Sequence, residues 1–163
     1  MSYLKTVCFV CLLSLCVGSQ YTYASSVAFN QTQFDKIKQQ YQGQPWLMLL
    51  WSVDCPPCFK ELAIMQKLLA KHDDLAIVII NADADEGVMA QRKHIIKKFA
   101  LTQFNIYHFA DGQADQSRFL IDPAWYGELP RSYFVESNGT FHGKSGLVQE
   151  SMVTQWLVKQ PIK

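Results

Sequence analysis

The sequence predicts a single α/β domain, in which a strand–helix–strand unit is followed by a β-hairpin and a C-terminal helix. Two continuous apolar runs, at 46–52 and 75–80, have the length of strands and are separated by a helical stripe. Runs of this kind are typical of strands that are covered on both faces. Further along, Asn138-Gly139 lies between two strand-like segments, and this dipeptide is a strong hairpin signal.

The first half of the domain is expected to alternate helices and strands. Phe34 and Ile37 recur at helical spacing, and Pro45 ends the helix that they indicate. The next helix opens with Pro56 and Pro57, which a first turn tolerates because its N–H groups have no helical partner. In order, we expect helix 31–40, strand 46–52, helix 56–71, strand 75–80 and helix 88–99.

The second half is expected to end with the hairpin and a closing helix. Its elements, in order, are strand 105–109, helix 113–120, strands 132–136 and 140–144, and helix 149–159. On the closing helix, we expect Met152, Val153 and Trp156 to face inward.

Two groups of charged residues are interpreted as solvated. Asn81, Asp83 and Asp85 faintly resemble a calcium loop, but the glycine and the terminal glutamate of that motif are out of place. We therefore expect an exposed strand-to-helix loop here. Arg92 and the basic residues that follow it, up to Lys98, are expected to form a solvent-exposed helix face.

Residues 1–24 are typical of a secretory signal peptide. Lys5 precedes an apolar run at 7–17, and Ala24 offers a small residue at the expected cleavage position. The run is shorter than the ~20 residues that a membrane-spanning helix needs. We expect the signal to be removed and residues 25–163 to form the single domain; the alternative is an uncleaved membrane anchor through 7–17.

The five cysteines fall into two groups. Cys8, Cys11 and Cys16 lie in the N-terminal segment, whereas Cys55 and Cys58 form a C-x-x-C pair. A single pair makes no multi-bridge scaffold and supplies only two of the four ligands of a structural zinc site. The sequence therefore predicts a dithiol that opens and closes, with no cofactor beyond this redox-active pair.

The charge of the chain is balanced. Its 15 Lys and Arg residues nearly match its 14 Asp and Glu residues, which gives a formal net charge of +1. No strong field attracts such a chain to nucleic acid or to an anionic membrane surface, so we expect neither as a partner.

Several motifs surround the cysteine pair. Trp51 precedes it by four residues, Glu61 follows Cys58 by three, and a Tyr-Gly-Glu-Leu-Pro segment ends at Pro130, before the hairpin. With Cys55 and Cys58 at a strand-to-helix turn, this order resembles the thioredoxin fold, which implies a central mixed sheet flanked by helices. More narrowly, the chain resembles the exported TlpA/ResA-type thiol–disulfide oxidoreductases.

Three residues depart from that family's pattern. Asp54 stands where such proteins usually have Trp before the first cysteine, and Ala63 stands where many have Pro. Leu49 occupies a position where relatives often carry Asp or Asn, so no second buried carboxylate is expected beside the dithiol.

The position of the two cysteines predicts a division of labour. Cys55 lies just ahead of a helix, where free N–H groups and the helix dipole favour a thiolate, so we expect it to be the nucleophile. Cys58 lies inside the first turn and is expected to resolve the mixed disulfide. Pro56 and Pro57 offer no N–H to the sulfur, and Asp54 adds a like charge, so we expect a reducing couple.

The resemblance adds further site residues. It implies that the Leu129–Pro130 bond is cis, with Leu129 at the contact with substrate and Trp51 supporting the site. Glu61, one helical turn beyond Cys58, is a candidate proton relay; the alternative is a glutamate on the helix surface.

The sequence thus predicts an exported, periplasmic oxidoreductase that reduces disulfides in other proteins. The resemblance implies substrates such as the haem-site cysteines of apocytochrome c or other oxidised protein thiols, and a membrane electron donor. Two alternatives remain open: an oxidase or isomerase of oxidative folding, and a module that holds a soft metal such as Cu(I).

Overall fold

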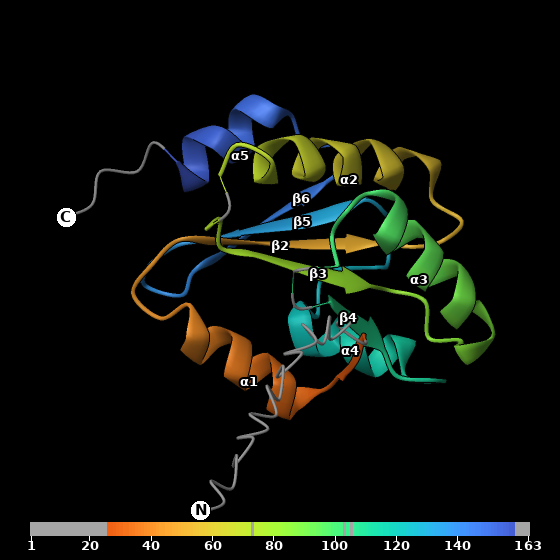
Figure 1. Ribbon diagram of the computed structural model, residues 1–163. Helices are drawn as coiled ribbons and strands as arrows, with labels where there is room; N and C mark the ends of the chain where they lie inside the picture. Colours follow the sequence, from red (N-terminus) through yellow and green to blue (C-terminus); the bar gives the residue numbers. More distant parts are fainter. Residues whose placement is uncertain (1–25, 73, 103, 105, 159–163) are drawn as a thin grey trace, which may run out of the picture.

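A computed structural model describes residues 26–158 apart from 73, 103 and 105 (Figure 1). The predicted signal peptide at 1–24 and the alternative anchor at 7–17 lie outside the described residues, as does the expected end of the closing helix at 159. Within the described part, no helix has both the length and the apolar character that crossing a membrane requires.

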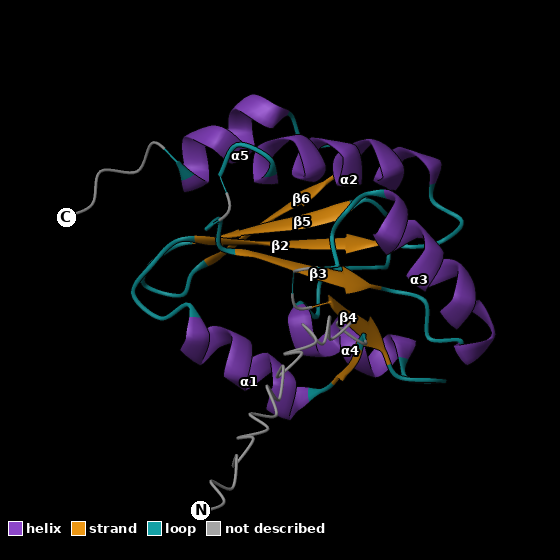
Figure 2. Ribbon diagram, in the orientation of Figure 1, coloured by secondary structure: helices purple, strands orange, loops and turns teal. Residues whose placement is uncertain are grey.

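The described residues form one six-stranded sheet with helices on both faces (Figure 2). In chain order, the elements are β1 (Val27–Phe29), α1 (Gln31–Gln40), β2 (Trp46–Trp51), α2 (Pro56–Leu69), β3 (Ile77–Asn81), η1 (Glu86–Val88), α3 (Met89–Lys98), β4 (Ile106–Phe109), α4 (Ala114–Ile121), β5 (Arg131–Val135), β6 (Phe141–Ser145) and α5 (Glu150–Leu157).

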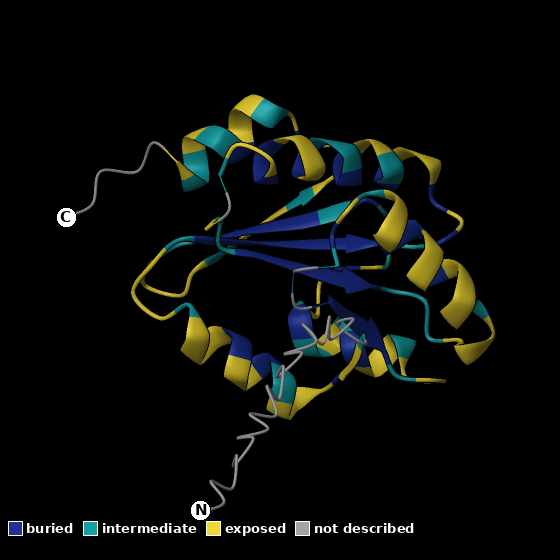
Figure 3. Cartoon of the chain, in the orientation of Figure 1, coloured by how far each residue is buried: buried dark blue, intermediate teal, exposed yellow. Residues whose placement is uncertain are grey.

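The sheet is mixed, as expected, and its strand order is β1-β4-β3-β2-β5-β6. The first four strands in that order run parallel, whereas β5 pairs antiparallel with both β2 and β6. All six residues of β2 are at most 2% exposed, so this strand lies in the interior of the molecule (Figure 3).

Side chains alternate along β2 between two hydrophobic cores. Leu47, Leu49 and Trp51 pack with α2, α3 and α5, whereas Met48 and Leu50 pack with α1 and α4. Figure 1 shows the two layers, with α2 and α5 on one face of the sheet and α1 and α4 on the other. Alternating burial of this kind makes β2 a rigid support for the segment that follows it.

The structure departs from the sequence prediction at the edge of the sheet. The three-residue strand β1, which pairs with β4, was not predicted. The strand expected from residue 75 begins at Ile77, because pairing with β2 starts there, at Leu47.

Two predictions about which side chains are buried were wrong. Met152 on α5 is 37% exposed, whereas Val153 is fully buried and Trp156 is half-buried. Arg92 is only 2% exposed, so it does not belong to a solvent-exposed basic face. Its guanidinium is instead hydrogen-bonded inside the molecule, to Asn81 and to two backbone carbonyl groups.

Candidate active site

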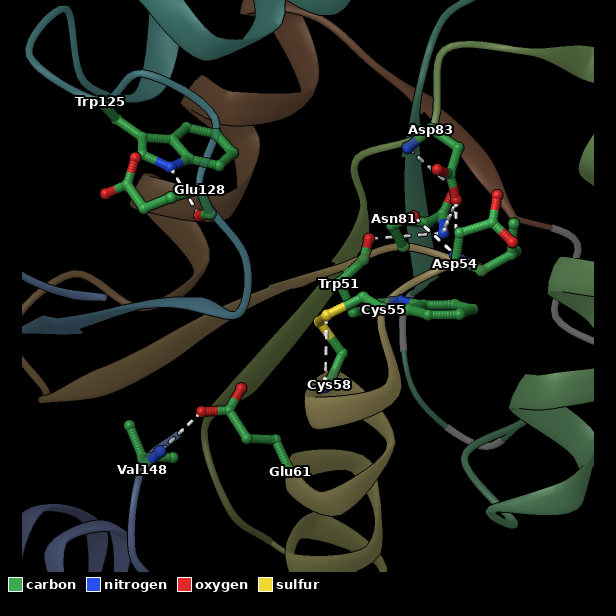
Figure 4. The surroundings of a disulfide bond; sticks show 12 residues. Trp51, Asp54, Cys55, Cys58, Glu61, Asn81, Asp83, Trp125, Glu128 and Val148 are labelled. Carbon is green, nitrogen blue, oxygen red and sulfur yellow. Dashed lines mark hydrogen bonds between the residues drawn. A yellow bond between two sulfur atoms is a disulfide. The ribbon is translucent and has the colours of Figure 1, made fainter. Parts of the chain in front are cut away.

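A disulfide between Cys55 and Cys58 lies where β2 leads into α2 (Figure 4). Their Cα atoms are 5.3 Å apart. Cys55 is the N-cap of α2, and its Sγ accepts a hydrogen bond of 3.3 Å from the N–H of Cys58. Pro56 and Pro57 occupy the first two helical positions, as predicted, and leave this N–H as the donor that reaches the sulfur.

The two sulfurs differ in access. Cys55 is 7% exposed to solvent, whereas Cys58 is completely buried. Asp54, immediately before Cys55, is exposed, as are both prolines. A substrate approaching from solvent therefore reaches Cys55 first, which supports the predicted order of nucleophile and resolving cysteine.

Glu61 is completely buried, one turn along α2 from Cys58 (Figure 4). Its Oε1 accepts a 2.7 Å hydrogen bond from the N–H of Val148, and its Oε2 has no hydrogen-bond partner. Burial raises the pKa of Glu61 to about 7, while the Val148 bond and the positive charge of Lys144 act in the opposite direction. The alternative of a glutamate on the helix surface was therefore wrong.

The Leu129–Pro130 peptide bond is cis, as predicted. Leu50 pairs with Arg131 across β2 and β5, so Pro130 comes at the register position beside Trp51, the last residue of β2. Pro130 is buried and Leu129 is half-buried. Since Cys55 follows Trp51 closely, the cis bond and the disulfide lie at the same edge of the sheet.

Aromatic residues belong to the two segments that lead to the disulfide and to the cis bond. Trp51 is completely buried, and its indole N–H has no hydrogen-bond partner. Trp125 is buried and donates its indole N–H to the carbonyl oxygen of Glu128 at 3.0 Å, which shapes the loop before Pro130. Tyr126, on the same loop, is 93% exposed.

A polar network beneath the loop at 52–54 was missed from the sequence. Asp83 accepts a 2.9 Å hydrogen bond from the N–H of Val53, and Asn81 links Asp83 to Arg92. The expectation of a simply solvated loop at 81–86 was wrong for Asn81, which is fully buried. The sequence did contain a signal for this network. Asn81 and Asp83 stand at the carboxyl end of a parallel strand, and ligands and active sites gather at that edge of such a sheet.

Metal ligands do not gather at this site. Among the described residues, no three His, Cys, Asp or Glu side chains are grouped so that they could hold a metal ion.

The fold and the dithiol together define a thioredoxin-like protein with a C-x-x-C disulfide at the start of a helix. Solved structures agree on the fold. A secreted disulfide oxidoreductase of Mycobacterium tuberculosis, described as homologous to DsbE of E. coli, superposes with a TM-score of 0.56 at 21% identity, covering 75% of this chain and 86% of that one. StoA from Bacillus subtilis gives a TM-score of 0.52 at 22% identity, covering 71% and 83%.

The sequence is similar to proteins named thiol-disulfide oxidoreductase ResA. That of a Bacillus cereus strain is 29% identical over 98 residues, which cover 60% of this chain and 52% of the relative. That of Bacillus anthracis is 28% identical with the same coverage. The chain thus spans about half the length of these curated relatives, and no family model matches it. The predicted resemblance to TlpA/ResA-type thioredoxin-like proteins is confirmed.

Proposed function

We propose that the protein is an extracytoplasmic thiol:disulfide oxidoreductase that reduces disulfides in other proteins. The observation that carries this proposal is the pairing of a reachable Cys55 with a buried Cys58 at the N-terminus of α2. This arrangement favours a two-step exchange, because one sulfur meets the partner and the other stays inside to release it.

The exchange moves two electrons from the dithiol to the substrate. The Cys55 thiolate attacks one sulfur of the substrate disulfide; a mixed disulfide forms, and the other substrate sulfur leaves as a thiolate that takes up a proton. Cys58 then loses its proton and attacks the sulfur of Cys55. The Cys55–Cys58 bond forms, and the second substrate sulfur leaves as a thiolate and is protonated in turn.

Glu61 is proposed to accept the proton of Cys58. It lies one turn away on the same helix, and a pKa of about 7 matches a base that works near neutral pH. Leu49 on β2 is apolar and buried, so it offers no carboxyl group to this part of the interior. The buried carboxyl group near Cys58 is that of Glu61, on α2.

Partners and location belong to the same proposal. The electrons are proposed to come from a membrane donor and to pass to oxidised protein thiols, such as those of apocytochrome c, without a bound cofactor. Export through residues 1–24 to the periplasm fits the similarity to a structure described as that of a secreted oxidoreductase. In an oxidising compartment, the Cys55–Cys58 pair would need such a donor to be kept in its reduced, dithiol form.

The direction of electron flow is tested by the reduction potential of the Cys55–Cys58 couple, measured by equilibration with thiol buffers. A value near thioredoxin's, about −270 mV, supports the reductase. A value near about −120 mV would make the protein an oxidant of folding proteins instead. Failure to form the disulfide, with Cu(I) bound to both thiolates, would favour the metal-handling module.

A further inference from the structure

The segment that leads from β2 to Cys55 is hydrogen-bonded to the carboxylate of Asp83. Asp83 Oδ2 accepts hydrogen bonds from the N–H of Val53 at 2.9 Å and from Nδ2 of Asn81 at 2.8 Å. Asn81 Nδ2 is also within 3.4 Å of the carbonyl oxygen of Trp51. The last residue of β2 and the short connection that leads to Cys55 are therefore bonded to Asn81 and Asp83, where β3 ends (Figure 4).

A buried arginine, Arg92, is hydrogen-bonded to the segment that carries Asp83, through the side chain of Asn81 and two backbone carbonyl oxygens. Arg92 Nε donates to Asn81 Oδ1 at 2.8 Å, and its Nη2 donates to the carbonyl oxygens of Asp83 at 3.2 Å and Asp85 at 3.4 Å. Burial lowers the pKa of Arg92, and the negative charges of Asp83, Glu86 and Asp85 oppose that effect. A buried cation of this kind is retained at a cost unless it is paired and hydrogen-bonded.

The charges of Asp83 and Arg92 are not equally close to Cys55 along these hydrogen bonds. Asp83 bonds directly to Val53, two residues before Cys55, whereas the side chain of Arg92 meets that segment only through Asn81 and Asp83. The negative charge is therefore the nearer one along this bonded path. The other charged groups drawn around the dithiol are the carboxyl groups of Asp54 in the loop, Glu61 on α2 and Glu128 before Pro130 (Figure 4).

We propose that Asp83 is a positioning residue that fixes the backbone ahead of Cys55 and, through a negative charge offset by Arg92, sets how readily the Cys55 thiol ionises. This inference rests on the proposed exchange at Cys55. It adds a residue outside the C-x-x-C motif that controls the nucleophile, and it assigns opposite effects to the two charges. Removing Asp83's charge stabilises the thiolate, and removing Arg92's charge destabilises it.

The test is the rate at which iodoacetamide alkylates Cys55 in the reduced protein, read by mass spectrometry of the peptide that contains it. D83N keeps an oxygen at the position of Oδ2 and so keeps both hydrogen bonds, but removes the charge. We expect alkylation at about pH 6.5 to be about two- to fourfold faster in D83N, since a larger thiolate fraction outweighs a weaker nucleophile. R92Q is expected to slow it, and E136Q, which makes the same charge change at the far end of the sheet, to leave it unchanged.

Three outcomes would overturn the proposal: an unchanged or slower rate in D83N, a faster rate in R92Q, or an E136Q effect as large as that of D83N. If D83A alters the rate but D83N does not, Asp83 acts only as a hydrogen-bond acceptor and its charge sets nothing. R92Q removes a buried ion, so its folding is checked by thermal unfolding, and D83N alone decides if R92Q does not fold. Alkylation needs no protein substrate, so a failure of the proposed reductase activity is seen separately.

Discussion

The N–H of Val148 donates a 2.7 Å hydrogen bond to Oε1 of Glu61, joining the segment before α5 to the beginning of α2. Both residues are completely buried. The bond holds the carboxyl group in the interior near Cys58, yet it satisfies only one of the two oxygens, because Oε2 has no partner. A carboxyl group in this setting favours its neutral form, and this has consequences for both stability and catalysis.

Glu61→Gln should flatten the dependence of stability on pH. The pKa of Glu61 is about 7 in the folded state, against an ordinary value of 4.5. Between these values the folded state binds more protons than the unfolded state, so the free energy of unfolding falls as pH rises. The shift corresponds to roughly 3 kcal/mol, which is lost by about pH 7 and above. Urea unfolding at several pH values measures this slope.

The matched control is Glu150→Gln on α5, where the carboxylate is partly exposed and paired with Lys71 at 3.5 Å. It should leave the slope unchanged. Glu61→Gln should also slow release of the mixed disulfide by up to about 100-fold near neutral pH, since the base is missing. A release rate equal to that of the unmodified protein would remove Glu61 from the mechanism.

The two cysteine variants should behave differently. Cys55→Ser removes the reachable sulfur and should abolish turnover without trapping a partner. Cys58→Ser should accumulate a mixed disulfide with the substrate, because the buried resolving thiol is gone. Non-reducing gel electrophoresis with a model protein disulfide separates the two, and equal trapping by both variants would contradict the division of labour.

Arg131→Met should loosen the loop that ends at the cis bond. Arg131 bonds to Asp122 at 3.0 Å, to Glu128 at 3.3 Å and to Ser145 at 2.7 Å, and its side chain is 13% exposed. We expect a loss of about 1–3 kcal/mol in the free energy of unfolding. We also expect KM to rise more for protein disulfides than for glutathione disulfide, because only the larger substrate would lie along this loop.

Two further variants control that experiment. Gly143→Ala would place a Cβ onto the guanidinium of Arg131 and should reproduce the effect. Lys38→Met breaks an exposed ion pair with Asp35 on α1, away from this loop, and should cost less than about 1 kcal/mol. A similar KM change in all three variants would show that the Arg131 contacts do not act through the loop.

Asn30→Ala should destabilise the protein by about 1 kcal/mol. Asn30 is the N-cap of α1, and its side-chain oxygen accepts the N–H of Gln33 at 3.0 Å. The loss should lower the thermal midpoint by about 2–5 °C in calorimetry. Gln40→Ala, at the exposed end of the same helix, should leave the midpoint nearly unchanged.

The sequence predicted best where hydrophobic pattern alone determines an element. The run that became β2 is apolar at every position because both faces are covered, and Asn138-Gly139 marked the hairpin because Gly139 adopts a φ of +87°. β1 could not be predicted in the same way. Three residues carry too little pattern, and the strand exists because β4 offers an edge with which to pair.

At the site, one error came from a polar residue on an apolar stripe. Arg92 lies on the buried stripe of α3, but its charge favoured solvent in the sequence prediction. For Glu61, on the buried stripe of α2 between Cys58 and Met65, the sequence left a proton relay and a surface glutamate open. What decided the outcome was a partner on another element, Val148 for Glu61 and Asn81 for Arg92, and periodicity within one helix contains no information about such partners.

The interior position of β2 also has a meaning for local opening. This strand is bonded to β3 on one side and β5 on the other, and solvent reaches none of its residues appreciably. Amides in such a strand exchange their hydrogens only when the whole domain opens, whereas loops and helix ends exchange through small fluctuations. In the proposed exchange, the two sulfurs are thus attached to the part of the described domain that we expect to open last, so bonds at Cys55 would be made and broken on a folded support.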